Sequence, residues 1–134
     1  MARRWFTIPL IAAAAANSAA AHHSISRVYD SSRQVTVEGV VTEFRFINPH
    51  PFLIIEAGVE GAEQSWQLEM DNRAELARIG VTAETFRSGD RVVARGSIGR
   101  ADPQTLYLRR LERHADGLLY EQRGGTPIIS ADRR

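Results

Sequence analysis

The sequence predicts a small, mainly β domain, an OB-like barrel of five strands with one short helix between strands 3 and 4. The prediction depends first on the order of patterns along the chain, which is three strands, a helix and two strands. It depends second on the long first strand, whose apolar and polar residues change their phase of alternation at Gly39-Val40. A bend at a mid-strand glycine is what a small closed barrel needs. A β-sandwich with one helical insertion is the main alternative.

Five apolar residues of the first strand define the change of phase. Val35 and Val37 lie on one phase of the alternation. Val40, Phe44 and Phe46 lie on the other. Because neighbouring side chains of a strand point to opposite faces, this change predicts a β-bulge or a sharp coil where the two phases meet.

Prolines and polar turn residues separate the remaining strands. The segment Asn48-Pro49-His50-Pro51 ends the first strand, since proline lacks a backbone donor and keeps the preceding residue extended. Trp66, Leu68 and Met70 alternate with polar residues, so we expect them to face inward from the third strand. The five predicted strands cover residues 34–47, 52–57, 65–70, 91–98 and 105–113.

One short helix is expected after the third strand. Asn72 with Glu75 resembles a capping box, apolar residues follow at helical spacing, and Gly80 ends the pattern. Near the end of the chain, Asp116-Gly117 is a two-residue hairpin signal. Residues 118–121 are therefore expected to pair back on the fifth strand.

The beginning of the chain is typical of a secretory signal peptide. Arg3 and Arg4 give a positive start, an apolar run follows, and Ala19 and Ala21 give a small-residue cleavage signature. We therefore expect a periplasmic or secreted protein, cleaved after Ala20 or Ala21, with no stable membrane insertion after cleavage. The predicted organisation is a signal peptide at 1–21, an N-terminal arm at 22–33, the barrel at 34–122 and a flexible tail at 123–134.

Composition excludes several classes of function. Without the leader, the chain would hold 15 basic and 16 acidic residues, and a formal charge of −1 gives no long-range attraction for nucleic acid. The absence of cysteine excludes disulfides and thiolate ligands, and the absence of lysine excludes Schiff-base chemistry. No motif of a hydrolase, nucleotide-binding protein or metalloprotease is present. We therefore predict no catalytic or cofactor-binding residues, and a binding module is favoured over an enzyme.

Three of the four histidines form a candidate metal site: His22, His23 and His50. A cut after Ala21 would make His22 the first residue, so its amine and its ring would chelate one ion together. A cut after Ala20 would place His23 third, where the amine, two backbone amides and the ring would surround the ion. Both ligand sets are rich in nitrogen, which favours Cu(II) over tetrahedral zinc. The sequence therefore predicts a copper site, provided that His50 lies close to the N-terminal pair.

Other interpretations of these residues stay open. His50, between two prolines, would serve equally well as a rigid loop residue whose ring bonds to a neighbouring carbonyl. Glu69 is either a solvated strand charge or a ligand to a metal held by His50. His114 is expected to be a solvated surface residue. The alternative function is a metal-free periplasmic module that binds a peptide, a glycan or another envelope protein through its barrel face.

Several motifs together carry a resemblance to a known family. They are Ala21-His22-His23-Ser24, Val35-x-Val37-x-Gly39-x-Val41, Ile47-Asn48-Pro49-His50, Trp66-Gln67-Leu68-Glu69-Met70, Gly80-Val81-Thr82 and Ser88-Gly89-Asp90-Arg91-Val92. Over essentially the whole mature chain, they resemble the bacterial exported proteins of the domain of unknown function 6152 family. The chain departs from the usual pattern of that family at two places. Val81 stands at a position that is often aromatic, and the fifth strand is unusually rich in arginine. The family has no established activity, so the resemblance implies export and domain limits, and its most specific motifs contain the three candidate histidines.

Overall fold

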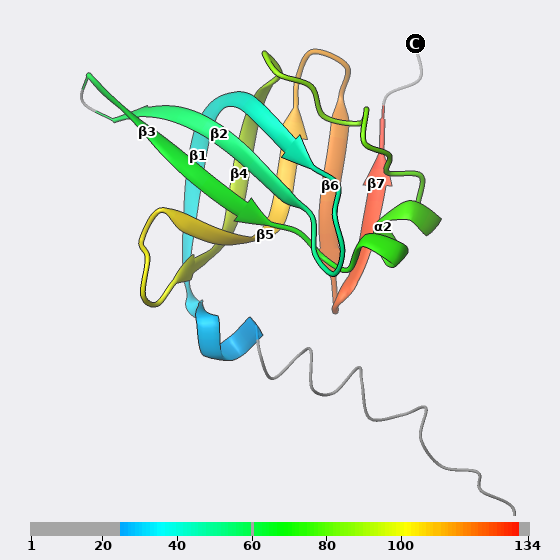
Figure 1. Cartoon of the computed structure of the whole chain (residues 1–134), viewed down its shortest axis with the longest axis horizontal. Coiled ribbons are helices and arrows are strands. Elements are labelled where there is room, and N and C mark those ends of the chain that lie inside the picture. Colours follow the sequence, from blue (N-terminus) through cyan, green and yellow to red (C-terminus); the bar gives the residue numbers. More distant parts are fainter. Residues whose placement is uncertain (1–24, 60, 132–134) are drawn as a thin grey trace, which may run out of the picture.

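The computed structural model describes residues 25–59 and 61–131, which form one curved sheet and one short helix (Figure 1). The helix α2 (Arg73–Arg78) lies between β3 and β4, and residues 25–28 form a helical turn before β1. No helix in these two ranges is long and apolar enough to cross a membrane. The strands are β1 (Tyr29–Arg45), β2 (Phe52–Val59), β3 (Ala62–Glu69), β4 (Arg91–Gly99), β5 (Thr105–Arg113), β6 (Leu118–Arg123) and β7 (Thr126–Ser130).

The seven strands are joined in the order β3-β2-β1-β4-β5-β6-β7, with an additional pairing between β3 and β5. That additional pairing is parallel and aligns Gln67 with Thr105 and Glu69 with Tyr107, whereas the other pairings are antiparallel. Each of the strands β1 to β5 therefore has hydrogen-bonded neighbours on both sides. The strands β6 and β7 extend the sheet from β5, and β2 and β3 cross in front of β1 and β4 (Figure 1).

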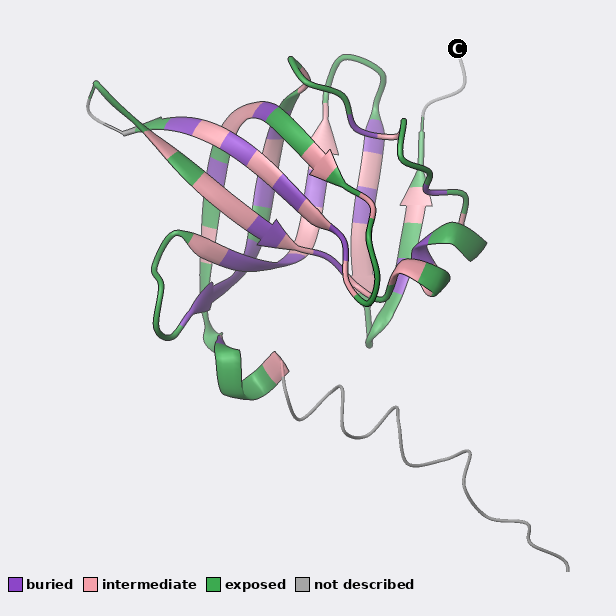
Figure 2. Cartoon of the chain, in the orientation of Figure 1, coloured by how far each residue is buried: buried purple, intermediate pink, exposed green. Residues whose placement is uncertain are grey.

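The core lies on the inner face of this curved sheet, where buried and more exposed residues alternate along several strands (Figure 2). Leu68 and Met70 have no exposed surface and Trp66 packs against the same core, which confirms the predicted inward phase of the third strand. Burial of such side chains is the main source of stability for a domain without disulfides. The largest buried apolar side chains are those of Tyr120, Leu53, Ile55, Leu68, Met70, Leu76, Leu106, Leu108, Leu111, Val41, Val81 and Val92.

The predicted change of phase in the first strand is present, but it lies at Thr42 rather than at Gly39-Val40. The register between β1 and β2 shifts between Val41 and Glu43, so Thr42 is the extra residue of a bulge. Val41 is fully buried before this bulge, and Phe44 packs against the core after it. The predicted position was wrong because Val41, and not Val40, points into the core.

Gly39 has a different role, which is to allow two strands to approach closely. A Cβ at this position would lie 2.5 Å from the carbonyl oxygen of Glu56 and 3.3 Å from the Cβ of Ala57. The atom nearest to it belongs to the β2 backbone, which cannot move aside as the end of a flexible side chain can. Glycine is therefore required by the space between β1 and β2.

Both ends of the described chain are more regular than predicted. The predicted arm is partly helical, and β1 begins at Tyr29, which pairs with Gly99. The predicted flexible tail contains β7, which pairs with β6 over residues 119–130. Gly124 and Gly125 both adopt positive φ and form the turn that reverses the chain. The sheet therefore has seven strands in the described residues, instead of the five predicted.

The predicted helix is confirmed as α2. The side chain of Asn72 accepts a hydrogen bond of 2.8 Å from the backbone N–H of Ala74, so it caps the first turn. Gly80 follows the helix with a φ of 95°, a conformation that favours glycine. Glu75 lies 3.7 Å from Arg78, with which it forms an ion pair along the helix.

Candidate functional site

The loop between β1 and β2 is attached to the segment that links β3 to α2. The carbonyl of Pro49 accepts a hydrogen bond of 3.0 Å from the N–H of Arg73, and the carbonyl of Pro51 accepts one of 2.9 Å from the N–H of Met70. The two prolines cannot donate, but their carbonyls hold the loop in place on either side of His50. The position of His50 is therefore set by backbone contacts with residues distant in sequence.

One ring nitrogen of His50 is used within the protein. Its Nδ1 atom lies 2.9 Å from the carbonyl oxygen of Met70 and 3.3 Å from Oε1 of Glu69. Both neighbours are acceptors, so Nδ1 carries a proton and, in the neutral ring, Nε2 does not. Within residues 25–59 and 61–131, Nε2 has no hydrogen-bond partner. This nitrogen therefore keeps a lone pair that can accept a proton or bind a cation.

Glu69 connects His50 to the start of β1. Its Oε2 atom accepts a hydrogen bond of 2.7 Å from the hydroxyl of Tyr29. Burial and the adjacent Glu69 carboxylate raise the pKa of Tyr29, so the phenol remains a neutral donor. The side chains of Glu69 and His50 are 19% and 16% exposed, which leaves the pair shielded but reachable from solvent.

A second set of hydrogen bonds is centred on Gln122 of β6. Its Nε2 group donates to Oδ2 of Asp71 at 2.9 Å and to the hydroxyl of Tyr107 at 3.0 Å. Its Oε1 atom accepts a hydrogen bond of 2.7 Å from Nη1 of Arg109. The guanidinium of Arg109 also lies 4.8 Å from the centre of the Tyr107 ring. One amide of β6 therefore links a carboxylate that follows β3 to a phenol and a guanidinium of β5.

The two sets of contacts are adjacent. The rings of Tyr29 and Tyr107 are 5.7 Å apart, and Glu69 is aligned with Tyr107 in the β3–β5 pairing. Both tyrosines are buried but lie outside the apolar core, and burial raises the pKa of Tyr107 to about 12. We call the seven residues of both sets the polar cluster; its members are Tyr29, His50, Glu69, Asp71, Tyr107, Arg109 and Gln122.

Of the three predicted metal ligands, the structure describes only His50. Glu69, for which a solvated strand charge and a metal ligand were the two expectations, lies 3.3 Å from Nδ1 of His50. His22 and His23 lie outside the described residues. In the described part of the chain, no group of three or more His, Cys, Asp or Glu side chains is arranged to hold a metal ion. His114 is 75% exposed beside Glu112, as predicted for a surface residue.

Sequence reasoning missed most of the polar cluster. The sequence predicts Tyr29 in an extended N-terminal arm, Gln122 at the end of the barrel and Tyr107 within the fifth strand. The one available signal was the unusual run of arginines in the fifth strand, which includes Arg109. The cluster depends on pairings between residues far apart in sequence, and no local pattern reveals these.

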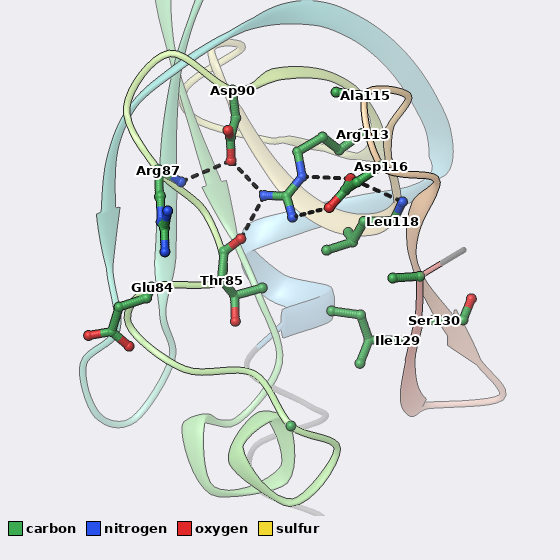
Figure 3. Close-up of a pocket in the computed structure, with 12 residues that line it drawn as sticks. Glu84, Thr85, Arg87, Asp90, Arg113, Ala115, Asp116, Leu118, Ile129 and Ser130 are labelled. Atoms are coloured by element: carbon green, nitrogen blue, oxygen red, sulfur yellow. Dashed lines mark hydrogen bonds and ion pairs between the residues drawn. The ribbon is translucent and has the colours of Figure 1, made fainter. Parts of the chain in front are cut away.

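A groove of about 620 Å³ lies beside the loop that follows α2 and the end of β5 (Figure 3). The positive charge of Arg113, which lines this groove, is already compensated by neighbouring carboxylates. Arg113 donates through Nη1 to Oδ2 of Asp90 and to the carbonyl of Thr85, both at 2.6 Å. Its Nε and Nη2 atoms donate to Asp116 at 3.0 and 2.8 Å. Only 14% of the Arg113 side chain is exposed. This guanidinium therefore joins three segments of the protein and is not available as a ligand site.

Comparisons with known proteins identify a family and a similar fold. The model of a family of unknown function, DUF6152, matches residues 10–106. No curated protein matches the chain. Among solved structures, the chain is similar to the ZRD-deleted mutant of TiaS in complex with agmatine, with a TM-score of 0.50 and 19% sequence identity.

The similarity to TiaS covers 72% of this chain and 29% of the TiaS chain, so the chain spans less than a third of that protein. At this level of identity, the similarity shows a shared fold alone. The family match is different in kind, because it covers more than half of the sequence and includes the Asn-Pro-His loop. The protein therefore belongs to the family of unknown function DUF6152.

Proposed function

We propose that the protein is a small copper-binding module in which His22, His23 and His50 hold one Cu(II) ion. The observation that supports this most directly is the hydrogen bond from Nδ1 of His50 to the carbonyl of Met70, with Glu69 beside it. A metal-binding histidine generally donates its second ring N–H to a carbonyl or a carboxylate, which fixes the ring and makes the other nitrogen a better ligand. His50 has this arrangement, with Nε2 left for the metal.

The length of chain before Tyr29 supports a site shared by His50 and the N-terminal histidines. Even with residues 25–28 helical, the stretch from His23 to Tyr29 allows a reach of about 15 Å. Tyr29 is hydrogen-bonded to Glu69, which contacts His50, so the chain enters β1 close to the proposed site. An N-terminal amine and several imidazoles form a nitrogen ligand set of the kind that Cu(II) prefers.

The proposal extends to the fold and to the location of the protein. The circuit of pairings β1-β2-β3-β5-β4, with α2 between β3 and β4, supports an OB-like barrel to which β6 and β7 are added. A signal peptide at residues 1–21 would deliver the mature chain to the periplasm or the exterior, with His22 or Ala21 as its first residue. The protein would then take up copper outside the cytoplasm.

The test is a copper titration of a chain that begins at His22, followed by calorimetry and electron paramagnetic resonance. We expect uptake of one equivalent of Cu(II), with affinity weakened about tenfold or more by His50→Ala. His114→Ala is the matched control and leaves the affinity unchanged. Glu69→Gln weakens it by about 10- to 100-fold, as is usual for a residue that orients a ligand. Acetylation of the N-terminal amine weakens binding, because the amide that replaces it is no longer a ligand.

The absence of copper uptake by the correctly processed chain, or full affinity in His50→Ala, would overturn this proposal. The second candidate is a metal-free module that binds an envelope protein, a peptide or a glycan. It is favoured by Ile47, a large apolar residue that is 49% exposed beside the Asn48–Pro51 loop. In that case His22→Ala and His50→Ala would leave partner binding unchanged, whereas Ile47→Ser would weaken it.

A further inference from the structure

A small cavity adjoins the polar cluster and is lined in part by Ile25 and Ser26 of the helical turn at residues 25–28. Its volume is about 170 Å³. A water molecule in the liquid takes about 30 Å³, so the cavity holds about five waters or one organic molecule of a few heavy atoms. Pockets for larger ligands begin at about 300 Å³, which limits the size of any occupant. The polar residues that line the cavity include Tyr29, Asp71, Ser97, Tyr107, Arg109 and Gln122.

Three hydrogen-bond donors that line the cavity have hydrogens without acceptors among the described residues. Arg109 uses Nη1 for Gln122, but its Nε and Nη2 groups have no such partner. The hydroxyl of Tyr107 accepts from Gln122 and does not donate to any described residue. The hydroxyl of Ser97 likewise accepts a hydrogen bond of 2.8 Å from Gln34 and has no described acceptor of its own.

Two of these donors, the hydroxyls of Ser97 and Tyr107, are shielded from bulk water, whereas Arg109 is only partly buried. Ser97 is 1% exposed and Tyr107 is 3% exposed. Buried donors are almost always paired with an acceptor, since an unpaired one destabilises the fold. Burial raises the pKa of Tyr107 to about 12, so its hydroxyl keeps its proton and remains a donor. Together with the cationic Arg109, these groups fit an occupant with an anionic, acceptor-rich end.

The cavity also contains a negative group. The two carboxylate oxygens of Asp71 accept hydrogen bonds from the N–H of Asn72 at 2.7 Å and from Gln122 at 2.9 Å, and each keeps further lone pairs. No ion pair joins Asp71 to Arg109 in the described part of the chain, because the amide of Gln122 lies between them and bonds to both. The cavity therefore presents one positive and one negative group, separated by the length of an amide and two hydrogen bonds.

We propose that this cavity binds a small zwitterion of the α-amino acid class. The carboxylate would receive hydrogen bonds from Arg109, Tyr107 and Ser97, and guanidinium groups are well suited to bind carboxylates with two donors. The ammonium group would lie against Asp71. An open groove lined by Arg95, Arg109 and other residues adjoins the cavity at Arg109 and supplies positive charge at its entrance. The proposal uses no histidine and is independent of the copper site.

The test measures binding of four small probes to the purified protein, namely glycine, alanine, acetate and methylamine. Calorimetry or chemical-shift titration at low salt, with probes up to about 10 mM, detects dissociation constants near 1 mM. We expect glycine and alanine to bind. Acetate and methylamine, which each carry one of the two charges, should bind about tenfold or more weakly.

Two variants test the proposed contacts. Arg109→Gln removes the positive charge, and Asp71→Asn removes the negative charge but keeps an acceptor for Gln122; each should weaken alanine binding about tenfold or more. Arg45→Gln is the matched control, because Arg45 is half exposed, pairs with Glu43 and does not line the cavity. Tyr107→Phe is a second probe of the same contact if Arg109→Gln fails to fold.

Three outcomes would overturn the proposal. The first is the absence of binding by both glycine and alanine. The second is acetate binding as tightly as alanine, which would indicate a simple anion site. The third is unchanged alanine affinity in a folded Arg109→Gln or Tyr107→Phe variant. A copper titration of the same variants separates the two proposals, because neither substitution removes a proposed copper ligand.

Discussion

Tyr29 donates a hydrogen bond of 2.7 Å to Glu69, and this bond joins the first residue of β1 to the last residue of β3. Glu69 in turn contacts His50 at 3.3 Å, so the beginning of the described chain is linked to the loop between β1 and β2. The contact places a phenol, a carboxylate and an imidazole in a row outside the apolar core. The stability of the fold and the proposed function therefore share these residues.

Removing the hydroxyl of Tyr29 should destabilise the protein. We expect Tyr29→Phe to lower the free energy of unfolding by about 1–3 kcal/mol at neutral pH, because it deletes a partly buried hydrogen bond to a charged acceptor. Urea denaturation followed by circular dichroism measures the change. Tyr120→Phe is the matched control, since the Tyr120 hydroxyl is fully buried and has no partner among the described residues. That substitution should be neutral or stabilising, and an equal loss in both variants would contradict the prediction.

Arg113 should contribute to stability through its contacts in the groove. Arg113→Met leaves Asp90 and Asp116 without their shared partner, and we expect a loss of about 2–4 kcal/mol in the free energy of unfolding. Arg45→Met removes an exposed pair with Glu43 and should have no measurable effect. Comparable losses in the two variants would show that the ion pairs of Arg113 stabilise the fold no more than the exposed pair of Arg45 does.

The same guanidinium should make stability depend on pH. The hydrogen bond from Arg113 holds the pKa of Asp116 below its usual value of 3.8. A carboxyl group with a lowered pKa stabilises the fold above about pH 4–5, and this contribution is lost as the pH falls through the folded-state pKa. Urea denaturation between neutral and acidic pH should therefore show a smaller acid-induced loss in Arg113→Met than in the wild type. Identical pH profiles would contradict the assignment.

The close approach at Gly39 gives a fourth prediction. In Gly39→Ala, the new methyl group would meet the carbonyl oxygen of Glu56, so we expect a loss of about 1–3 kcal/mol from overpacking. Gly58 is the matched control on the neighbouring strand, where a Cβ would meet no atom within 4 Å. Thermal denaturation should show a lower Tm for Gly39→Ala and little change for Gly58→Ala. The reverse order would show that β1 and β2 can separate at low cost.

The cap of α2 gives a fifth prediction. Asn72→Ala removes the acceptor for the N–H of Ala74 and should cost about 1 kcal/mol in the free energy of unfolding. Asn72→Asp keeps an acceptor at the helix N-terminus and should preserve most of the stability. Urea denaturation of both variants provides the measurement. If the two substitutions cost the same, packing of α2 rather than its cap would account for the effect.

Much of the fold could be predicted from local patterns. The cap at Asn72, the stop at Gly80 and the limits of β5 follow from residues that act within a few positions of one another. The strand β7 was missed because it is short and contains Pro127, which weakens a strand pattern. Its pairing with β6 depends on the turn at Gly124-Gly125, and two consecutive glycines are a turn signal that the sequence does contain.

The site was harder to predict than the fold. Sequence spacing could suggest that His50 and Glu69 act together, because both lie at unusual positions near strand ends. It could not suggest that Gln122 would join Asp71 to Arg109, since Asp71 and Gln122 are 51 residues apart in sequence. Such contacts are a product of strand order, and strand order depends on the packing of the whole core.

The parallel pairing between β3 and β5 makes the circuit of five strands behave as a single cooperative unit. Gln67 donates its backbone N–H to the carbonyl of Gln104 at 3.0 Å, at the point where the two segments meet. At Gln67, β3 is paired with β2 on one side and with β5 on the other, so fraying from an unpaired edge does not expose this amide. Exchange of the Gln67 amide with solvent deuterium should therefore require an opening close to global unfolding, and this one proton would report on the integrity of the entire circuit.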